Sequence, residues 1–144
     1  MVDVSNKAAT DRFARARAFV RMTQAAADAL RGATLAKGDA LVAAQLAGIM
    51  AAKQTANLIP LAHPLPLAQV EIAFAWAEPA LLQIEATART SAQTGVEMEA
   101  MVGASIAALT IYDMLKAVDK GIRIEAVALV EKRGGKSGVW TAPA

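Results

Sequence analysis

The segment TGVEMEAMVGASIAALTIYDMLK, residues 94–116, predicts one long helix built almost entirely of small and apolar residues. Because small side chains let neighbouring elements approach closely, we expect this helix at the centre of the fold. Charged residues stand at its two ends, with Glu97 and Glu99 near the start and Asp113 and Lys116 near the finish. A buried helix carries such residues where they are paired or take part in chemistry.

The spacing of these charges separates two groups along the helix. Asp113 and Lys116 are three residues apart and therefore share one face. Glu99 and Asp113 are separated by about 20 Å along the axis, which is too far for contact but about the length of a nucleoside triphosphate. Asp113 and Lys116 fit two interpretations. They are an acid–base pair if burial brings their pKa values towards neutrality, or an ordinary i,i+3 salt bridge.

Composition excludes several classes of protein. Residues 1–144 are expected to form a single domain with a substantial core. The chain contains no cysteine, which excludes disulfides, thiolate metal sites and a thiol nucleophile. A net charge of +2 and an aromatic content of 4% argue against nucleic-acid binding. No apolar run reaches the roughly 18 residues of a membrane span, and the start has no apolar signal-peptide core, so we expect a cytoplasmic protein.

Segments with strand and helix patterns alternate along the chain. Their order predicts an α+β fold in which helices pack on one face of a mainly antiparallel sheet. Residues 134–144 are predicted to be a mobile glycine-rich loop and tail. Strands are predicted over residues 1–5, 13–21, 70–76, 81–90 and 122–130, and helices over residues 23–31, 38–57 and 95–119.

Two local motifs favour binding chemistry. His63 is the only histidine, and the neighbouring prolines hold its loop extended, so it is either a directed functional side chain or an ordinary surface histidine. It cannot form a zinc site alone, because the chain lacks further nitrogen or sulfur ligands. Lys37 stands just before a helix that Asp39 is expected to cap, and could reach a ligand held at that helix end.

The basic residues form two groups. Lys136 lies in the sequence RGGKSG, but a Walker loop would need a glycine where this chain has Val130. A cationic loop that folds over phosphates and a disordered basic tail both remain open for this segment. Either group could bind a short anionic ligand or could be plain surface charge. The first group consists of Arg12, Arg15, Arg17 and Arg21, and the second of Lys132, Arg133 and Lys136.

Taken together, these segments closely resemble the cyclic pyranopterin monophosphate synthase family, also called the molybdenum cofactor biosynthesis protein C family. Two departures are visible: Ala62 stands where the family usually has cysteine, and residues 33–36 replace a more polar, histidine-bearing stretch. The matching phrases occur in family order at Met1–Ser5, Lys37–Asp39, Leu58–Leu65, Thr94–Ala100, Ala108–Met114, Lys116–Val118 and Gly134–Gly138.

The resemblance implies a ferredoxin-like subunit assembled as a homohexamer, a trimer of dimers with active sites at the dimer interfaces. It also implies a reaction, in which 3′,8-cyclo-7,8-dihydro-GTP is converted to cyclic pyranopterin monophosphate with release of pyrophosphate. No cofactor is required, and Mg²⁺ accompanying the triphosphate stays open because no dedicated metal site is recognisable. The alternative is a non-catalytic regulatory domain that binds a nucleotide at a subunit interface.

The resemblance also assigns residues by position. Asp113 and Lys116 correspond to the central acid–base pair. The proton transfers needed to open and close rings suit such a pair, and cations suit the departing pyrophosphate. The implied substrate-binding residues are Leu61, Ala62, His63, Met98, Glu99 and Glu97, together with Lys37, Lys132 and Lys136 around the substrate and its phosphates.

Overall fold

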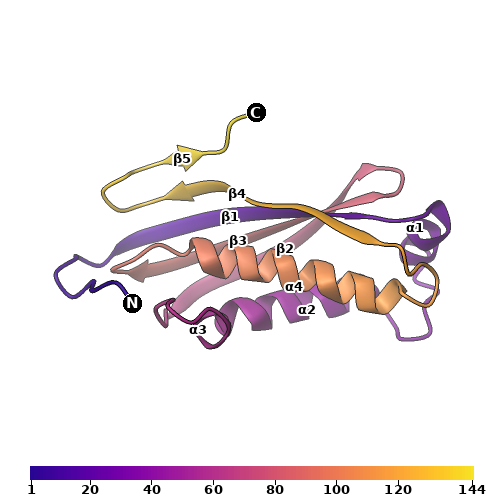
Figure 1. Ribbon diagram of the computed structural model, residues 1–144, viewed down its shortest axis with the longest axis horizontal. Helices are drawn as coiled ribbons and strands as arrows, with labels where there is room; N and C mark the ends of the chain where they lie inside the picture. The colour runs from indigo at the N-terminus through magenta and orange to yellow at the C-terminus, as the bar shows by residue number, and fades with distance from the viewer.

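The computed structural model describes residues 1–144 as a five-stranded sheet with the helices α2 and α4 side by side across one face (Figure 1). The strand order is β2-β3-β1-β4-β5, and all neighbours are antiparallel. The first four strands and the intervening helices follow the βαββαβ order, so the predicted ferredoxin-like α+β fold is confirmed. The elements are β1 Thr10–Arg21, α1 Gln24–Arg31, α2 Ala40–Lys53, α3 Thr55–Leu58, β2 Leu67–Glu78, β3 Leu81–Ala92, α4 Glu97–Leu115, β4 Arg123–Arg133 and β5 Trp140–Thr141.

Strand β1 shows how alternation in sequence becomes two faces of the sheet. Ala14, Ala16 and Ala18 face the helices and are fully buried. The arginines of alternate positions lie on the opposite face, because successive side chains of a strand point to opposite sides. There Arg17 pairs with Glu85 on β3 at 2.9 Å. Arg15 and Arg21 likewise pair with glutamates of neighbouring strands, namely Glu131 and Glu125.

Helix α4 packs on an alanine surface at the centre of the molecule. It contacts α2 and the strands β1, β3 and β4, and its own buried face includes Ala100, Ala104 and Ala107. By length and composition alone this helix could cross a membrane, but packing within the fold accounts for its apolar character. The predicted central position of the helix is confirmed.

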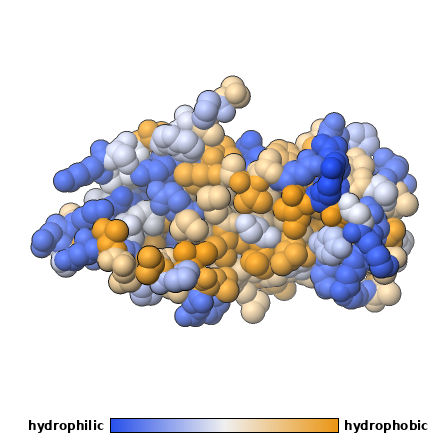
Figure 2. Space-filling model, in the orientation of Figure 1, coloured by the Kyte–Doolittle hydropathy of each residue, from blue (hydrophilic) through white to orange (hydrophobic).

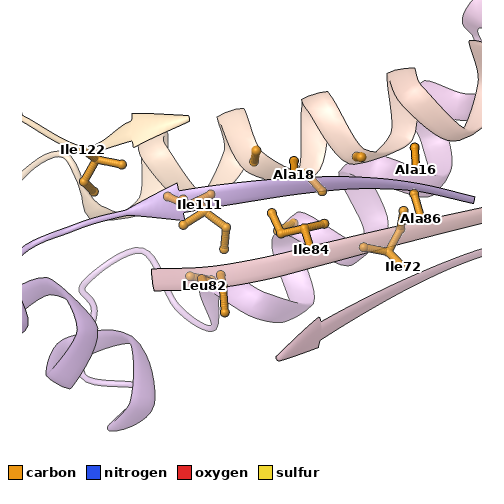
Figure 3. Packing of buried hydrophobic residues seen from close by; sticks show 14 of the residues in the cluster. Ala16, Ala18, Ile72, Leu82, Ile84, Ala86, Ile111 and Ile122 are labelled. Carbon is orange, nitrogen blue, oxygen red and sulfur yellow. The ribbon is translucent and has the colours of Figure 1, made fainter. Parts of the chain in front are cut away.

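The two long helices are in close contact where α2 carries Gly48. A Cβ atom on Gly48 would lie 2.9 Å from the carbonyl oxygen of Gly103 in α4 and 3.0 Å from the Ile72 side chain. Ile72 is itself buried beneath this crossing, and Figure 3 shows it with Ile84 and Ile111 in the layer between sheet and helices. Glycine at position 48 therefore sets the distance between the helices.

Several element boundaries differ from the sequence predictions. Residues 1–5 form no strand; instead Asp3 accepts a hydrogen bond from the Ser5 amide at 2.9 Å, which holds the segment in a turn. The second helix ends at Lys53, because Gln54 switches to an i,i+3 bond, and α3 follows separately. Strand β5 was not predicted, since two residues carry no periodic signal. The predicted cap at Asp39 is confirmed, as its carboxylate accepts from the amides of Leu41 and Val42.

The crossing at Gly48 makes a testable prediction. Gly48→Ala is expected to lower the free energy of unfolding by about 1–2 kcal/mol, because the added methyl group meets the backbone of α4. Gly103→Ala is the matched control, since its Cβ would have ordinary contacts of 3.4–3.6 Å. Chemical denaturation of both variants measures the difference. Equal stability of the two variants would contradict the role of Gly48.

Candidate active site

The first hollow lies where the loop of His63 meets the start of α4. Its volume is about 540 Å³. It brings together all the substrate-binding residues that were predicted around His63 and the first turn of α4. The lining residues are Met1, Val2, Val4, Lys7, Leu61, Ala62, His63, Leu65, Thr94, Gly95, Glu97, Met98 and Glu99.

His63 has a defined orientation in this hollow. Its Nε2 atom lies 2.7 Å from the carbonyl oxygen of Val2. Because a carbonyl oxygen only accepts hydrogen bonds, Nε2 carries the proton and donates it. In the neutral ring Nδ1 is then the acceptor, which fixes the tautomer available to a ligand.

A second, cationic hollow continues from the first. Its volume is about 650 Å³, and Lys7, Thr94, Gly95 and Glu97 line both spaces. Four basic side chains and one carboxylate surround it, which makes it suited to a polyanion. The lining residues are Asn6, Lys7, Ala8, Thr10, Arg12, Thr94, Gly95, Glu97, Lys132, Gly135, Lys136 and Ser137.

Glu97 stands between the two hollows and neutralises part of the cationic one. Its carboxylate lies 3.5 Å from the ammonium of Lys132, whose Nζ also donates to Ser137 at 2.7 Å. The carboxylate folds back over Gly95, where a Cβ atom would lie 2.1 Å from Oε2. Glycine at position 95 therefore permits this placement of Glu97.

Glu99 is the most buried carboxylate of the site. Only 4% of the residue is exposed. Burial raises its pKa above the usual range, and the nearby charge of Glu97 acts in the same direction, against a backbone hydrogen bond that lowers it. Glu99 is therefore protonated more readily than a solvent-exposed glutamate.

A separate charge cluster lies at the other end of α4. Asp113 accepts from Lys116 at 2.9 Å through Oδ1 and from Lys37 at 2.9 Å through Oδ2. Lys37 reaches this point from the loop before α2, where Gly38 adopts a positive φ of 105°. The structure thus adds a second lysine to the pair that the spacing of α4 predicted.

The pKa values in this cluster move apart rather than towards neutrality. The hydrogen bonds from Lys116 and then Lys37 lower the pKa of Asp113. The hydrogen bond to Asp113 raises the pKa of Lys116. All three side chains are about half exposed. The condition for the acid–base interpretation, that burial brings the two pKa values towards neutrality, is therefore not met within this single chain, which holds a carboxylate between two ammonium groups.

Within one chain, the predicted site residues form two groups. Lys132 and Lys136 lie beside the hollows at the start of α4, whereas Lys37 lies with Asp113 and Lys116 at its end. Glu99 and Asp113 are 14 positions apart, which corresponds to about 20 Å along the helix. No group of three or more His, Asp or Glu side chains converges to hold a metal ion.

Two cationic residues of the second hollow had no assigned role. Lys7 lies two residues after the phrase Met1–Ser5, so its proximity in sequence was the available signal. Arg12 was grouped with the other arginines of β1, but it stands at an even position and they stand at odd ones. Strand alternation therefore separates it from the arginines paired on the open face.

Fold and site together define a ferredoxin-like α+β protein with a hollow lined by cationic side chains and a separate, half-exposed aspartate–lysine cluster. The chain belongs to the MoaC family, whose model matches residues 1–135. A Nostoc sp. protein named cyclic pyranopterin monophosphate synthase is 57% identical over all of this chain and 86% of its own length. A Novosphingobium aromaticivorans protein of the same name is 55% identical over 99% of this chain and 90% of its own length.

The contact between Glu97 and Lys132 predicts a competition for anions. Glu97→Gln is expected to tighten binding of inorganic pyrophosphate about fivefold, because it removes a repelling charge and frees Lys132. Isothermal titration calorimetry measures the affinity. Glu71→Gln, on the exposed edge strand β2, removes the same charge elsewhere and serves as the control. Weaker binding by Glu97→Gln would show that the carboxylate does not compete with the ligand.

Proposed function

We propose that this protein is an enzyme of molybdenum cofactor biosynthesis. In this proposal it converts 3′,8-cyclo-7,8-dihydro-GTP to cyclic pyranopterin monophosphate and releases pyrophosphate. The names of its MoaC-family relatives support the activity. The structural observation that carries the proposal is the Lys37–Asp113–Lys116 cluster, which can supply an acid and a base. A separate cationic hollow is large enough for the phosphates.

The cluster suits the proton transfers of the rearrangement. Opening and closing rings requires a group that gives a proton and a group that takes one. The hydrogen bonds hold Asp113 as a carboxylate and Lys116 as an ammonium. We therefore assign the first proton acceptance to Asp113 and the first donation to Lys116, with Lys37 stabilising the carboxylate.

The cationic hollow suits the phosphate chemistry. When the cyclic phosphate forms, a hydroxyl oxygen bonds to the α-phosphorus, and the bond to the pyrophosphate oxygen breaks. The hydroxyl proton passes to a base, and negative charge accumulates on the departing pyrophosphate. Lys132 and Lys136 can stabilise that charge from the cationic hollow. Turnover measured with and without a chelator tests whether Mg²⁺ accompanies the triphosphate.

Assembly is part of the proposal, because one subunit leaves the two groups about 20 Å apart. We propose a cytoplasmic homohexamer, a trimer of dimers, in which each active site takes one group from each of two subunits. Exposed apolar side chains on the helices support a covering partner: Val42, Leu46 and Met50 on α2 and Leu109 on α4 are each more than half exposed. Figure 2 shows hydrophobic surface across this face.

A covering partner would also change the chemistry of the acid–base cluster. Removing water disfavours charged forms, so it would lower the pKa of Lys116 and raise that of Asp113. Both changes oppose the shifts found in one subunit and bring the pair closer to the working pH of an enzyme. Assembly would then activate the cluster as well as complete the site.

The direct test is pyrophosphate release from 3′,8-cyclo-7,8-dihydro-GTP. Wild-type protein is expected to release pyrophosphate and to form cyclic pyranopterin monophosphate, identified by mass spectrometry. Lys116→Ala is expected to lose at least about 100-fold in kcat, because it removes a proton donor. If folded wild-type protein binds the substrate without releasing pyrophosphate, the proposed activity fails. The non-catalytic nucleotide-binding domain would then be the better description.

Mixed oligomers test the shared site. Lys116→Ala and Lys132→Ala subunits, each inactive alone, are expected to recover about a quarter of wild-type activity when co-expressed at equal amounts. This fraction follows because half of the dimers are mixed and each of those has one intact site of two. Co-expressed Lys116→Ala and Asp113→Ala subunits are the control, since both changes lie in one cluster. Activity recovered in neither mixture would contradict sharing across the interface.

A further inference from the structure

The N-terminal segment, residues 1–7, forms part of the wall of the hollow around His63. One hydrogen bond joins this segment to the rest of the chain, and it runs from Nε2 of His63 to the carbonyl oxygen of Val2 at 2.7 Å. The two residues are 61 positions apart in sequence. Besides Val2, the segment contributes Met1, Val4 and Lys7 to the lining of the hollow.

A local turn determines where the Val2 carbonyl points. The amide of Ser5 donates to the carboxylate of Asp3 at 2.9 Å, and the amide of Lys7 donates to the carbonyl of Val4 at 3.0 Å. An aspartate that accepts from the backbone two residues further on fixes a turn. Because the Val2 carbonyl belongs to the peptide bond that joins Val2 to Asp3, this turn sets the direction of the carbonyl.

Polar contacts, rather than burial, hold the segment in place. Val2 is 70% exposed, so its apolar surface contributes little to fixing its position. Asp3 is exposed as well, and it does not line the hollow. Hydrogen bonds from Ser5, first through its side chain and then through its amide, lower the pKa of Asp3 and keep it a carboxylate. Asp3 can therefore act on a ligand only through the residues that it positions.

We propose that Asp3 is a positioning residue for His63. It folds the N-terminal segment into the turn that directs the Val2 carbonyl at Nε2, and this contact holds the proton of the neutral ring on Nε2. Nδ1 has no hydrogen-bond partner within the chain and is then an acceptor. The ligand group that matches it is an N–H donor.

A guanine-derived ring carries such donors, both on the ring and on its exocyclic amine. The identity of this ring rests on the proposed function, whereas the orientation of His63 rests on the geometry. With the proton on Nδ1 instead, the histidine would present a donor to a donor. The N-terminal turn thus favours a ligand that donates to His63 over one that only accepts.

Nuclear magnetic resonance of protein labelled with ¹⁵N-histidine tests this inference without any ligand. His63 is the only histidine, so its ring gives the only imidazole signals. At about pH 8, where a histidine with an ordinary pKa is neutral, wild type is expected to show a protonated Nε2 and an unprotonated Nδ1. Asp3→Ala is expected to move the two nitrogen signals towards each other and to speed exchange of the Nε2 proton about tenfold, because the contact is lost.

Two matched variants separate the hydrogen bond from charge and from general disturbance. Asp3→Asn removes the charge but keeps an oxygen that accepts from the Ser5 amide, so its His63 signals are expected to match wild type. Asp11→Ala removes an exposed carboxylate of β1 that takes part in no hydrogen bond or ion pair, and it is expected to leave the signals unchanged. Backbone amide spectra confirm that each variant is folded.

Turnover of the cyclic nucleotide tests the role of this orientation in binding. Asp3→Ala is expected to raise KM about fivefold and to change kcat less than about twofold, because His63 is present but less often in the orientation that binds. Asp3→Asn is expected to restore the KM of wild type. A variant that was merely less stable would change neither the His63 signals nor KM in its folded fraction.

Three outcomes would overturn the inference. One is unchanged His63 signals and proton exchange in folded Asp3→Ala, and another is Asp3→Asn that behaves as Asp3→Ala does. The third is altered signals in Asp3→Ala with an unchanged KM. The proposed function fails in a different way, since wild-type protein with the expected His63 signals that releases no pyrophosphate from the cyclic nucleotide would keep the orientation of His63 and refute the function.

Discussion

The close contact between α2 and α4 is the constraint on which the rest of the structure depends. Gly48 lets the two helices approach over Ile72, and the alanines of β1 and α4 let the helical layer lie low on the sheet. Larger side chains at these positions would raise α4 away from the sheet, and both of its ends would move. Because the hollows begin at one end of α4 and the Asp113 cluster lies at the other, this packing positions both groups.

Much of the fold could be predicted because its signals are local and periodic. The alternation of β1 and the long apolar run of α4 each identify an element, and their order predicts the α+β class. Short elements are harder to predict. The two residues of β5 cannot show a period, and the alternation in residues 1–5 is too short to predict whether they form a strand or a turn. The Asp39 cap was predictable because it depends on residues two and three positions away.

The sequence could name candidate residues for the site but could not predict how the fold arranges them. Spacing along α4 placed Asp113 and Lys116 on one face, yet the contact from Lys37 joins residues 76 positions apart and leaves no trace in local spacing. The resemblance placed Lys37, Lys132 and Lys136 around one substrate and its phosphates, whereas within the single chain Lys37 lies at the opposite end of α4 from the other two. Arg12 was grouped with the other arginines of β1 because the grouping used only their closeness in sequence and not the face of the strand on which each side chain lies.

Electrostatics connects the separation of these groups to assembly. A half-exposed aspartate between two lysines is a weak base, and a lysine paired with that aspartate is a weak acid, because each stabilises the charged form of the other. Water around the cluster favours these charged forms, and removing it would raise the pKa of Asp113 and lower that of Lys116. The helices expose an apolar face beside the cluster, and a second copy on that face would exclude water and supply the distant hollow. The surface that completes the site would thus also tune its acid and base.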